Sequence, residues 1–324
     1  MKIATFGASV TQQKTGYSTR LEKKFNCSVK TFGYGGMHLD NAAICFLDRI
    51  IEYRPDVCFL DWFSTSYNDT NDKTIECIET IINKLKQVNC NIVFLFFAFK
   101  NSPKKNDFYL FCKKILKNRN IAFIDINESI RKNDIEQILR DDVHTTEYGS
   151  KLYSDIIYQQ FQIIETSLAL PKQLYSTKYM NIKKLEVKKA FDKNLRIYGN
   201  CEIIGFLLHI GPHSGIVEVH QDNNSKKYNT WDRWCHYTRP HFNLSQTING
   251  DIVISVLDDD FDTSNCKIKN NFNKVKKQLI IEDIYYIGKS LCVKNISDGY
   301  EIKKEPFVVR IFRYAKTLIK AAIN

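Results

Sequence analysis

Three short stretches of the sequence carry the residue types that acyl transfer through a serine requires. The first is Gly7-Ala8-Ser9, which directly follows the apolar run from Ile3 to Phe6. A serine at the end of a strand points into the crevice above the sheet, where its hydroxyl can act as a nucleophile and its N–H can bind an oxyanion. Taken alone, Ser9 would serve equally well as a helix cap or turn residue.

The second stretch is Asp141-Asp142-Val143-His144, placed before the last helix of the first half. Histidine has the basicity to take the proton of a serine hydroxyl near neutral pH. A carboxylate must then hold the imidazole in one tautomer and stabilise the imidazolium. Asp141 and His144 are three residues apart and can meet within one loop. The alternative is that Thr145 or Thr146 caps the helix and His144 is simply exposed.

The third stretch is Gly33-Tyr34-Gly35-Gly36, which follows the second apolar strand. Glycine allows a backbone N–H to approach a substrate oxygen closely, as an oxyanion hole requires. A tight turn without a catalytic role would have the same composition.

Together, a Gly-x-Ser after the first strand, a Gly-x-x-Gly after the second and an Asp-x-x-His before the last helix resemble the SGNH hydrolases, also called the GDSL family, over residues 1–165. The resemblance implies that Ser9 is the nucleophile, His144 the general base and acid, and Asp141 its orienter. It also implies that the N–H groups of Ser9 and Gly36 form the oxyanion hole. The implied reaction is acyl transfer through a serine ester, most often hydrolysis of small acyl esters such as acetyl groups on carbohydrate.

The third sequence block of that family departs from its usual form. It normally reads Gly-x-Asn-Asp, and the asparagine side chain is the third oxyanion donor. Here Asn68-Asp69 comes about three residues late and without the glycine. We expect Asn68 to complete the oxyanion hole through a longer loop, with Ser64 or Thr65 at the usual position as the alternatives. The first block also reads Gly-Ala-Ser where Gly-Asp-Ser is usual.

A parallel sheet is needed to bring these loops together, and the first half of the chain has its pattern. Apolar strands alternate with amphipathic helices, which predicts a sheet covered on both faces, with chemistry beyond the carboxyl ends of its strands. The predicted fold class is α/β, a flavodoxin-like three-layer parallel sheet (SGNH-like). The expected strands are 3–6, 29–32, 57–63, 91–98 and 121–126, and the expected helices are 16–25, 39–53, 72–87, 108–117 and 146–164.

The second half changes to short strands separated by turn signals, which predicts a C-terminal antiparallel β-sandwich. We expect a linker at 166–188, the sandwich at 189–302, and a basic amphipathic helix at 303–324. The terminal helix is expected to pack on the sandwich. The alternative is peripheral contact of 306–323 with an anionic membrane.

An aromatic and polar stretch in the second half suggests a carbohydrate-binding surface. Trp231, Trp234, His236 and Arg239 together offer flat apolar faces with polar groups at their edges. The alternative is that the tryptophans belong to the core and the histidines to the surface. We expect no metal site, because alternation along strands would scatter the histidines of this region over both faces.

Composition restricts the remaining classes of function. Lysine and arginine exceed the acidic residues by 47 − 36 = 11, but no common nucleic-acid-binding motif is present, and codon bias would also enrich lysine. We therefore expect no nucleic-acid partner and no cofactor. The ten cysteines form no Cys-x-x-Cys pair, and the first residues do not read as an export signal. Reduced thiols in a cytoplasmic protein are the expectation.

These observations predict a serine esterase of the SGNH type acting on acyl, mainly acetyl, esters of carbohydrate or polysaccharide. A carbohydrate O-acyltransferase of surface polysaccharide synthesis, using the same triad, is the first alternative. A catalytically degenerate glycan-binding protein is the second.

Overall fold

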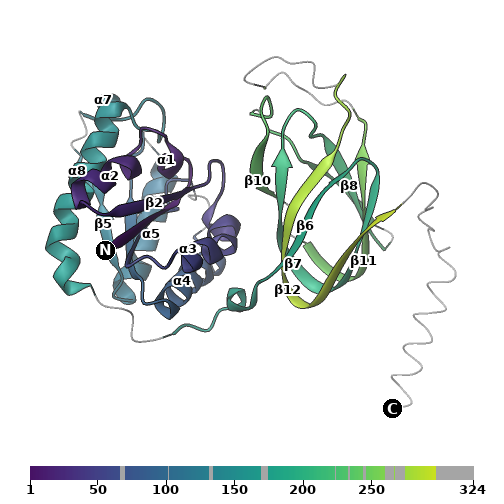
Figure 1. Ribbon diagram of the computed structural model, residues 1–324, viewed down its shortest axis with the longest axis horizontal. Coiled ribbons are helices and arrows are strands. Elements are labelled where there is room, and N and C mark those ends of the chain that lie inside the picture. The colour runs from purple at the N-terminus through teal and green to yellow at the C-terminus, as the bar shows by residue number, and fades with distance from the viewer. Residues whose placement is uncertain are drawn as a thin grey trace, which may run out of the picture. The chain divides into compact units, whose positions relative to one another are not determined.

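The computed structural model describes residues 1–65, 70–100, 102–130, 134–168, 174–222, 224–232, 234–243, 246–259, 266 and 274–296. The chain divides into two compact units, Met1–Ile182 and Lys183–Asn324 (Figure 1). The expected linker at 166–188 therefore contains residues of both units. The terminal helix expected at 303–324, with its membrane contact through 306–323, lies outside the described residues.

A five-stranded parallel sheet forms the centre of the first unit. Its order is β2-β1-β3-β4-β5, and every neighbouring pair is parallel. This is the strand order of flavodoxin-like folds. The expected SGNH-like α/β fold is confirmed. The strands are β1 (Lys2–Gly7), β2 (Ser28–Gly33), β3 (Val57–Asp61), β4 (Asn91–Phe96) and β5 (Ala122–Asp125).

Helices cover both faces of this sheet and make a three-layer unit. On one face, Tyr153 and Phe161 of α8 (Glu147–Ile164) share a core with Phe59 of β3 and with Leu21 of α2 (Tyr17–Phe25). Helices α3 (Leu47–Tyr53), α4 (Asp72–Gln87) and α5 (Pro103–Asn118) belong to the other face (Figure 1). The short elements are α1 (Ser9–Gln12), the π-type turn η1 (Leu39–Ala43), α6 (Ile126–Ser129), α7 (Ile135–Ile138), and the 3₁₀ turns η3 (Glu165–Ser167) and η4 (Lys178–Asn181).

Local sequence signals fix where the longer helices begin. Asn71 caps α4, Ser102 caps α5 with Pro103 in its first turn, and Thr146 caps α8, each by accepting a backbone N–H three residues later. The helix expected at 39–53 is divided, because η1 and α3 are separate elements. None of the helices in the described ranges is long and apolar enough to cross a membrane.

The second unit is an antiparallel sandwich, as expected, but long strands build it. Its strands are β6 (Lys183–Phe191), β7 (Asn194–Ile210), β8 (Ile216–Gln221), β9 (Asn224–Asn229), β10 (Arg239–Asn243), β11 (Gln246–Leu257) and β12 (Leu279–Ile296). The first part of β7 pairs with β11 and its last part with β10, while β12 follows β7 throughout. Strands β7 and β12 therefore contribute to both layers around one core.

The sequence prediction of uniformly short strands is wrong for β7 and β12. Three shifts of register bend β12, one of them between Gly288 and Ser290. Gly288 has φ +148°, and a Cβ there would lie 2.5 Å from the Asn200 carbonyl oxygen, so glycine is required at this bend.

Candidate active site

The carboxyl ends of three neighbouring strands bring the predicted loops together. Gly7 at the end of β1 is paired with Gly33 of β2 on one side and with Asp61 of β3 on the other. The Tyr34 N–H donates to the Gly7 carbonyl at 2.9 Å, and the Ala8 N–H donates to the Asp61 carbonyl at 3.0 Å. The chain leading into the single-turn helix α1 is thus tied to both neighbouring strands.

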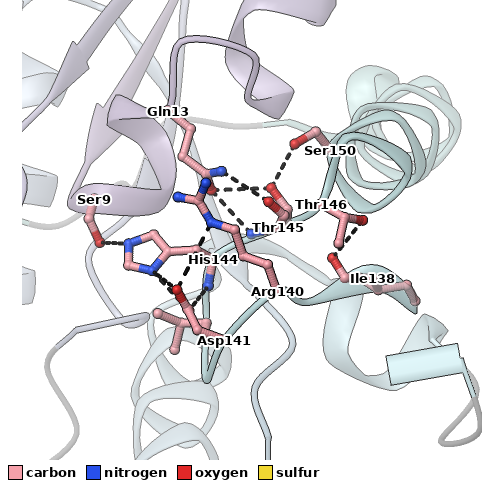
Figure 2. A network of polar contacts seen from close by, with 10 residues as sticks. Ser9, Gln13, Ile138, Arg140, Asp141, His144, Thr145, Thr146 and Ser150 are labelled. Carbon is pink, nitrogen blue, oxygen red and sulfur yellow. Dashed lines mark hydrogen bonds and ion pairs between the residues drawn. The ribbon is translucent and has the colours of Figure 1, made fainter. Parts of the chain in front are cut away.

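Ser9, His144 and Asp141 lie in line in the orientation that a serine nucleophile requires (Figure 2). Ser9 Oγ is 2.8 Å from His144 Nε2. On the other side of the ring, Nδ1 is 2.9 Å from Asp141 Oδ1 and 3.0 Å from Oδ2. A proton on Nδ1 pairs with the carboxylate and leaves the Nε2 lone pair to accept the serine proton.

The loop that carries His144 also determines the protonation of its partner, Asp141. Asp141 Oδ1 accepts the backbone N–H of His144 at 2.8 Å and that of Val143 at 3.1 Å. Burial raises the pKa of Asp141, but these two N–H groups and the imidazole outweigh it, so the pKa lies below its ordinary value. Asp141 is therefore a carboxylate at neutral pH, although half of its side chain is exposed.

Backbone bonds close the loop from Leu139 to Thr145 at its base. The two end residues form an antiparallel bridge, and the Arg140 N–H donates to the His144 carbonyl at 2.9 Å. Gly149 in the first turn of α8 packs so tightly that a Cβ would lie 2.2 Å from the Ile138 carbonyl oxygen. The position of His144 is therefore fixed by its own loop and by α8.

Gln13 joins this loop to the turn that carries Ser9 (Figure 2). Its side-chain oxygen accepts the Thr145 N–H at 3.2 Å and the Thr145 hydroxyl at 3.1 Å, and its Nε2 donates to the Thr145 carbonyl at 3.2 Å. Thr145 Oγ1 lies 2.6 Å from Ser150 Oγ on α8. The sequence analysis missed Gln13, because an amide one residue beyond a short helix carries no motif.

Two backbone N–H groups are available to bind an oxyanion. Gly36 has φ +73°, and a Cβ on Gly35 would lie 3.8 Å from Ser9 Cβ, so the glycine turn closely approaches Ser9. The Gly35 N–H is used, since it donates to Gln12 Oε1 at 2.8 Å. Within the described ranges, no hydrogen bond uses the N–H of Ser9 or of Gly36.

The third predicted oxyanion donor, Asn68, lies outside the described residues. Neither alternative has a hydroxyl that is both exposed and unbonded, because that of Ser64 is buried and that of Thr65 is bonded. Thr65 donates its hydroxyl to the Met37 carbonyl at 3.0 Å. Ser64 is 2 % exposed, and its hydroxyl is buried with Asp61, whose pKa it lowers.

A buried polar group separate from Ser9, His144 and Asp141 lies next to the turn that carries Ser9. Asp61 is fully buried and accepts the Thr11 hydroxyl at 3.0 Å through Oδ2. Lys105 of α5 is 2 % exposed and donates Nζ to the Ser64 carbonyl at 2.6 Å. In the sequence, Asp61 stands out as the single acidic residue in an apolar strand. Nothing in the pattern of α5 indicated Lys105.

The residues predicted to bind carbohydrate in the second unit divide into two groups. Trp231, Trp234 and His236 lie between β9 and β10, and Arg239 is the first residue of β10. Trp231 packs against the sandwich core, and Arg239 is held by an ion pair with Asp232. Trp234 is 40 % exposed, and its ring is 6.3 Å from that of His236. Tyr237, which the prediction left out, is 50 % exposed and adds a third ring 4.9 Å from His236.

The chain was compared with known proteins. No protein-family model and no curated protein matches it. Among solved structures, it is similar to a two-domain esterase (CEX) active on acetylated mannans, co-crystallized with mannopentaose. Their identity is 11 %, the TM-score is 0.62, and the match covers 90 % of this chain and 91 % of that one.

Two further solved structures are similar. A second structure of the two-domain mannan esterase gives 12 % identity, a TM-score of 0.60, and coverage of 90 % and 92 %. An acetyl xylan esterase, AlAXEase, gives 20 % identity and a TM-score of 0.42, with 49 % of this chain and 99 % of that one covered. At such identities the likeness to the two-domain esterase shows a shared fold over nine tenths of both chains.

Proposed function

We propose that this protein is a serine esterase that hydrolyses acyl esters, mainly acetyl esters, of carbohydrate. One observation carries the proposal. The Ser9 hydroxyl, the His144 imidazole and the Asp141 carboxylate are connected at 2.8 Å and 2.9 Å. This is the hydrogen-bonded relay that activates a serine. It also argues against the degenerate, binding-only alternative, for which no such relay is needed.

The reaction proceeds by attack of Ser9 Oγ on the acyl carbon while His144 Nε2 takes the hydroxyl proton. The N–H groups of Ser9 and Gly36 face no other acceptor in the described ranges and bind the oxyanion of the tetrahedral intermediate. His144 then returns its proton to the leaving sugar oxygen. Water, activated by the same imidazole, releases the acid from the acyl-enzyme.

The carbohydrate part of the proposal has two supports. The shared fold links this chain to an esterase active on acetylated mannans. The second unit presents Trp234, His236 and Tyr237 as neighbouring rings, the kind of surface on which a sugar stacks. We also propose a cytoplasmic location. In support, all ten cysteines are free, and a reducing compartment keeps thiols unpaired.

The catalytic part is tested with p-nitrophenyl acetate. We expect Ser9→Ala to lower turnover by on the order of 10⁴ or more, since removal of a triad serine has effects of that size. Ser129→Ala, which removes a hydroxyl at the end of α6, is the matched control and should hydrolyse the ester at the wild-type rate. Equal rates for wild type and Ser9→Ala would exclude Ser9 as the nucleophile.

The substrate class is tested separately by acetate release from acetylated mannan and acetylated xylan. Release by wild type and not by Ser9→Ala is expected. If the protein cleaved p-nitrophenyl acetate but released no acetate from either polymer, the carbohydrate part of the proposal would be wrong. The proposal of a serine esterase would stand. Adding a mannooligosaccharide acceptor distinguishes the transferase alternative, because acetyl transfer would yield an acetylated oligosaccharide in place of free acetate.

A further inference from the structure

A buried carboxylate lies next to the turn that carries Ser9 and takes no part in the hydrogen bonds between Ser9, His144 and Asp141. Asp61 is the last residue of β3, and its backbone is paired with Gly7, two positions before Ser9. Its side chain is fully buried and accepts a hydrogen bond from Thr11, and within the described residues it has none with His144 or Ser9. A buried acid is costly, because a carboxylate loses its hydration in the protein interior.

Asp61 holds the helix that carries Ser9 on both sides of the serine. Its backbone carbonyl accepts the N–H of Ala8, one residue before Ser9, at 3.0 Å. Its Oδ2 accepts the hydroxyl of Thr11, two residues after Ser9, at 3.0 Å. Helix α1 has only four residues and no side-chain cap. A single turn is unstable by itself, so these outside bonds determine its position.

Further hydrogen bonds connect Thr11 to helix α2. Thr11 Oγ1 lies 2.9 Å from the Tyr17 hydroxyl. Because the one Thr11 hydroxyl proton is donated to Asp61, Tyr17 must donate to Thr11. The Ser18 hydroxyl also donates to the Thr11 carbonyl, at 3.2 Å. The turn is therefore fixed to β3 on one side and to the start of α2 on the other.

The packing around Gly7 leaves no room for a side chain. A Cβ on Gly7 would lie 2.3 Å from the Asp61 carbonyl oxygen and 2.6 Å from Thr11 Oγ1. Burial raises the pKa of Asp61, and the positive charge of buried Lys105 is one of the effects that oppose this rise. Lys105 also fixes the residues that follow β3 by its bond to the Ser64 carbonyl.

We propose that Asp61 is the positioning residue of the nucleophile, and that its bond to Thr11 holds the Ser9 hydroxyl and N–H where His144 and the oxyanion need them. This inference rests on the proposed function, because it assigns Asp61 a role in the reactivity of Ser9. Displacement of a reacting group by about 1 Å lowers rates by up to 10²-fold. Loss of the bond should therefore affect turnover far more than substrate binding.

The test compares Thr11→Val with Thr11→Ser. Valine has the shape of threonine and lacks the hydroxyl, whereas serine retains it. The matched control is Thr80→Val, since Thr80 is also fully buried and its hydroxyl bonds the Glu76 carbonyl and Thr177. The rate of Ser9 labelling by a fluorophosphonate, with kcat and KM for p-nitrophenyl acetate, is measured for each protein.

We expect Thr11→Val to lower the labelling rate and kcat by about 10–100-fold with KM within twofold of wild type. Thr11→Ser should stay within threefold of wild type, and Thr80→Val should not change the labelling rate. Absence of labelling in wild type would refute the proposed function itself. Labelling of wild type and Thr11→Val at the same rate would refute only the role of Asp61.

A second variant keeps the test decisive if Thr11→Val does not fold. Thr11→Ala removes the hydroxyl without placing a methyl group against the carboxylate, and thermal denaturation establishes which variants fold. A folded Thr11→Ala protein with the same loss of kcat supports the proposal. If neither variant folds while Thr80→Val does, the bond maintains the fold rather than the position of Ser9, and the proposal is overturned.

Discussion

The titration of Asp61 predicts a pH dependence of stability that Asp61→Asn removes. Burial raises the pKa of this carboxyl from 3.8 to about 7, against the opposing effects of Ser64, Thr11 and Lys105. Between these values the folded protein holds a proton that the unfolded chain has released. The stability that this carboxyl contributes is therefore full below about pH 4 and is lost as the pH rises through about 7. Asparagine does not titrate.

The size of the effect follows from the two pKa values. A rise of about three pKa units corresponds to about 4 kcal/mol in all, at 1.36 kcal/mol for each unit. Between pH 5.5 and 7.5, the free energy of unfolding of wild type should fall by about 2 kcal/mol relative to Asp61→Asn. Above about pH 7.5 the difference should become constant.

The other titratable groups facing Asp61 act chiefly above this pH range. Burial lowers the pKa of Lys105 on α5 from 10.5 to about 8, so its own contribution changes between those values, where stability rises with pH. Tyr17 on α2, Tyr109 on α5 and Tyr153 on α8 also feel the charge of Asp61. Burial raises the pKa of each tyrosine above its ordinary value, well beyond the range measured.

The assay is urea unfolding of wild type and Asp61→Asn at pH 5.5, 6.5 and 7.5. Asp107→Asn, which removes an exposed carboxylate from α5, controls for the loss of one negative charge. A difference between wild type and Asp61→Asn that is constant over this range, or that grows in favour of wild type as the pH rises, would refute the reasoning. It would mean that Lys105 keeps Asp61 ionised throughout.

Three further predictions concern the loops around Ser9. Asp141→Asn should lower kcat for p-nitrophenyl acetate by about 10⁴, because the imidazole then takes the wrong tautomer; a loss below tenfold would contradict this role. Gln13→Ala should slow fluorophosphonate labelling about tenfold, since the bonds to Thr145, each worth about 1 kcal/mol, hold the two loops together; an unchanged labelling rate would show that the loops hold their positions without it. Gly149→Ala should destabilise the fold by about 1–3 kcal/mol, because a Cβ there meets the Ile138 carbonyl oxygen at 2.2 Å; a thermal midpoint equal to that of wild type would contradict the tight packing of α8.

Most of the first unit could be predicted from the sequence, because its strands are apolar on both faces and its helices have apolar stripes. The division of 39–53 into η1 and α3 could not, since both carry the same apolar spacing. In the second unit, the alternation of apolar and polar residues indicated the strands but not their lengths. The alternation of buried and exposed residues breaks inside both β7 and β12, so the sequence pattern indicates a strand end where each strand continues. Gly288 lies at one of the register shifts of β12.

The candidate site divides in a similar way. Ser9, Asp141 and His144 were predictable, because each follows a recognisable strand or precedes a helix at a spacing that chemistry requires. The residues that position them were not. Gln13 reaches a partner 132 residues away, and Asp61 acts through its neighbours in a sheet, so only the folded chain brings them together.

The wide separation of Ser9 and His144 along the chain has a consequence for the protein during its synthesis. The serine leaves the ribosome 135 residues before its base. At 5–20 residues per second, the interval is about 7–27 s. Throughout that time the nascent chain carries a serine with no imidazole to activate it. The loop from Leu139 to Thr145 then supplies the base and its carboxylate at once, so the proposed esterase activity would begin in a single step, about midway through translation.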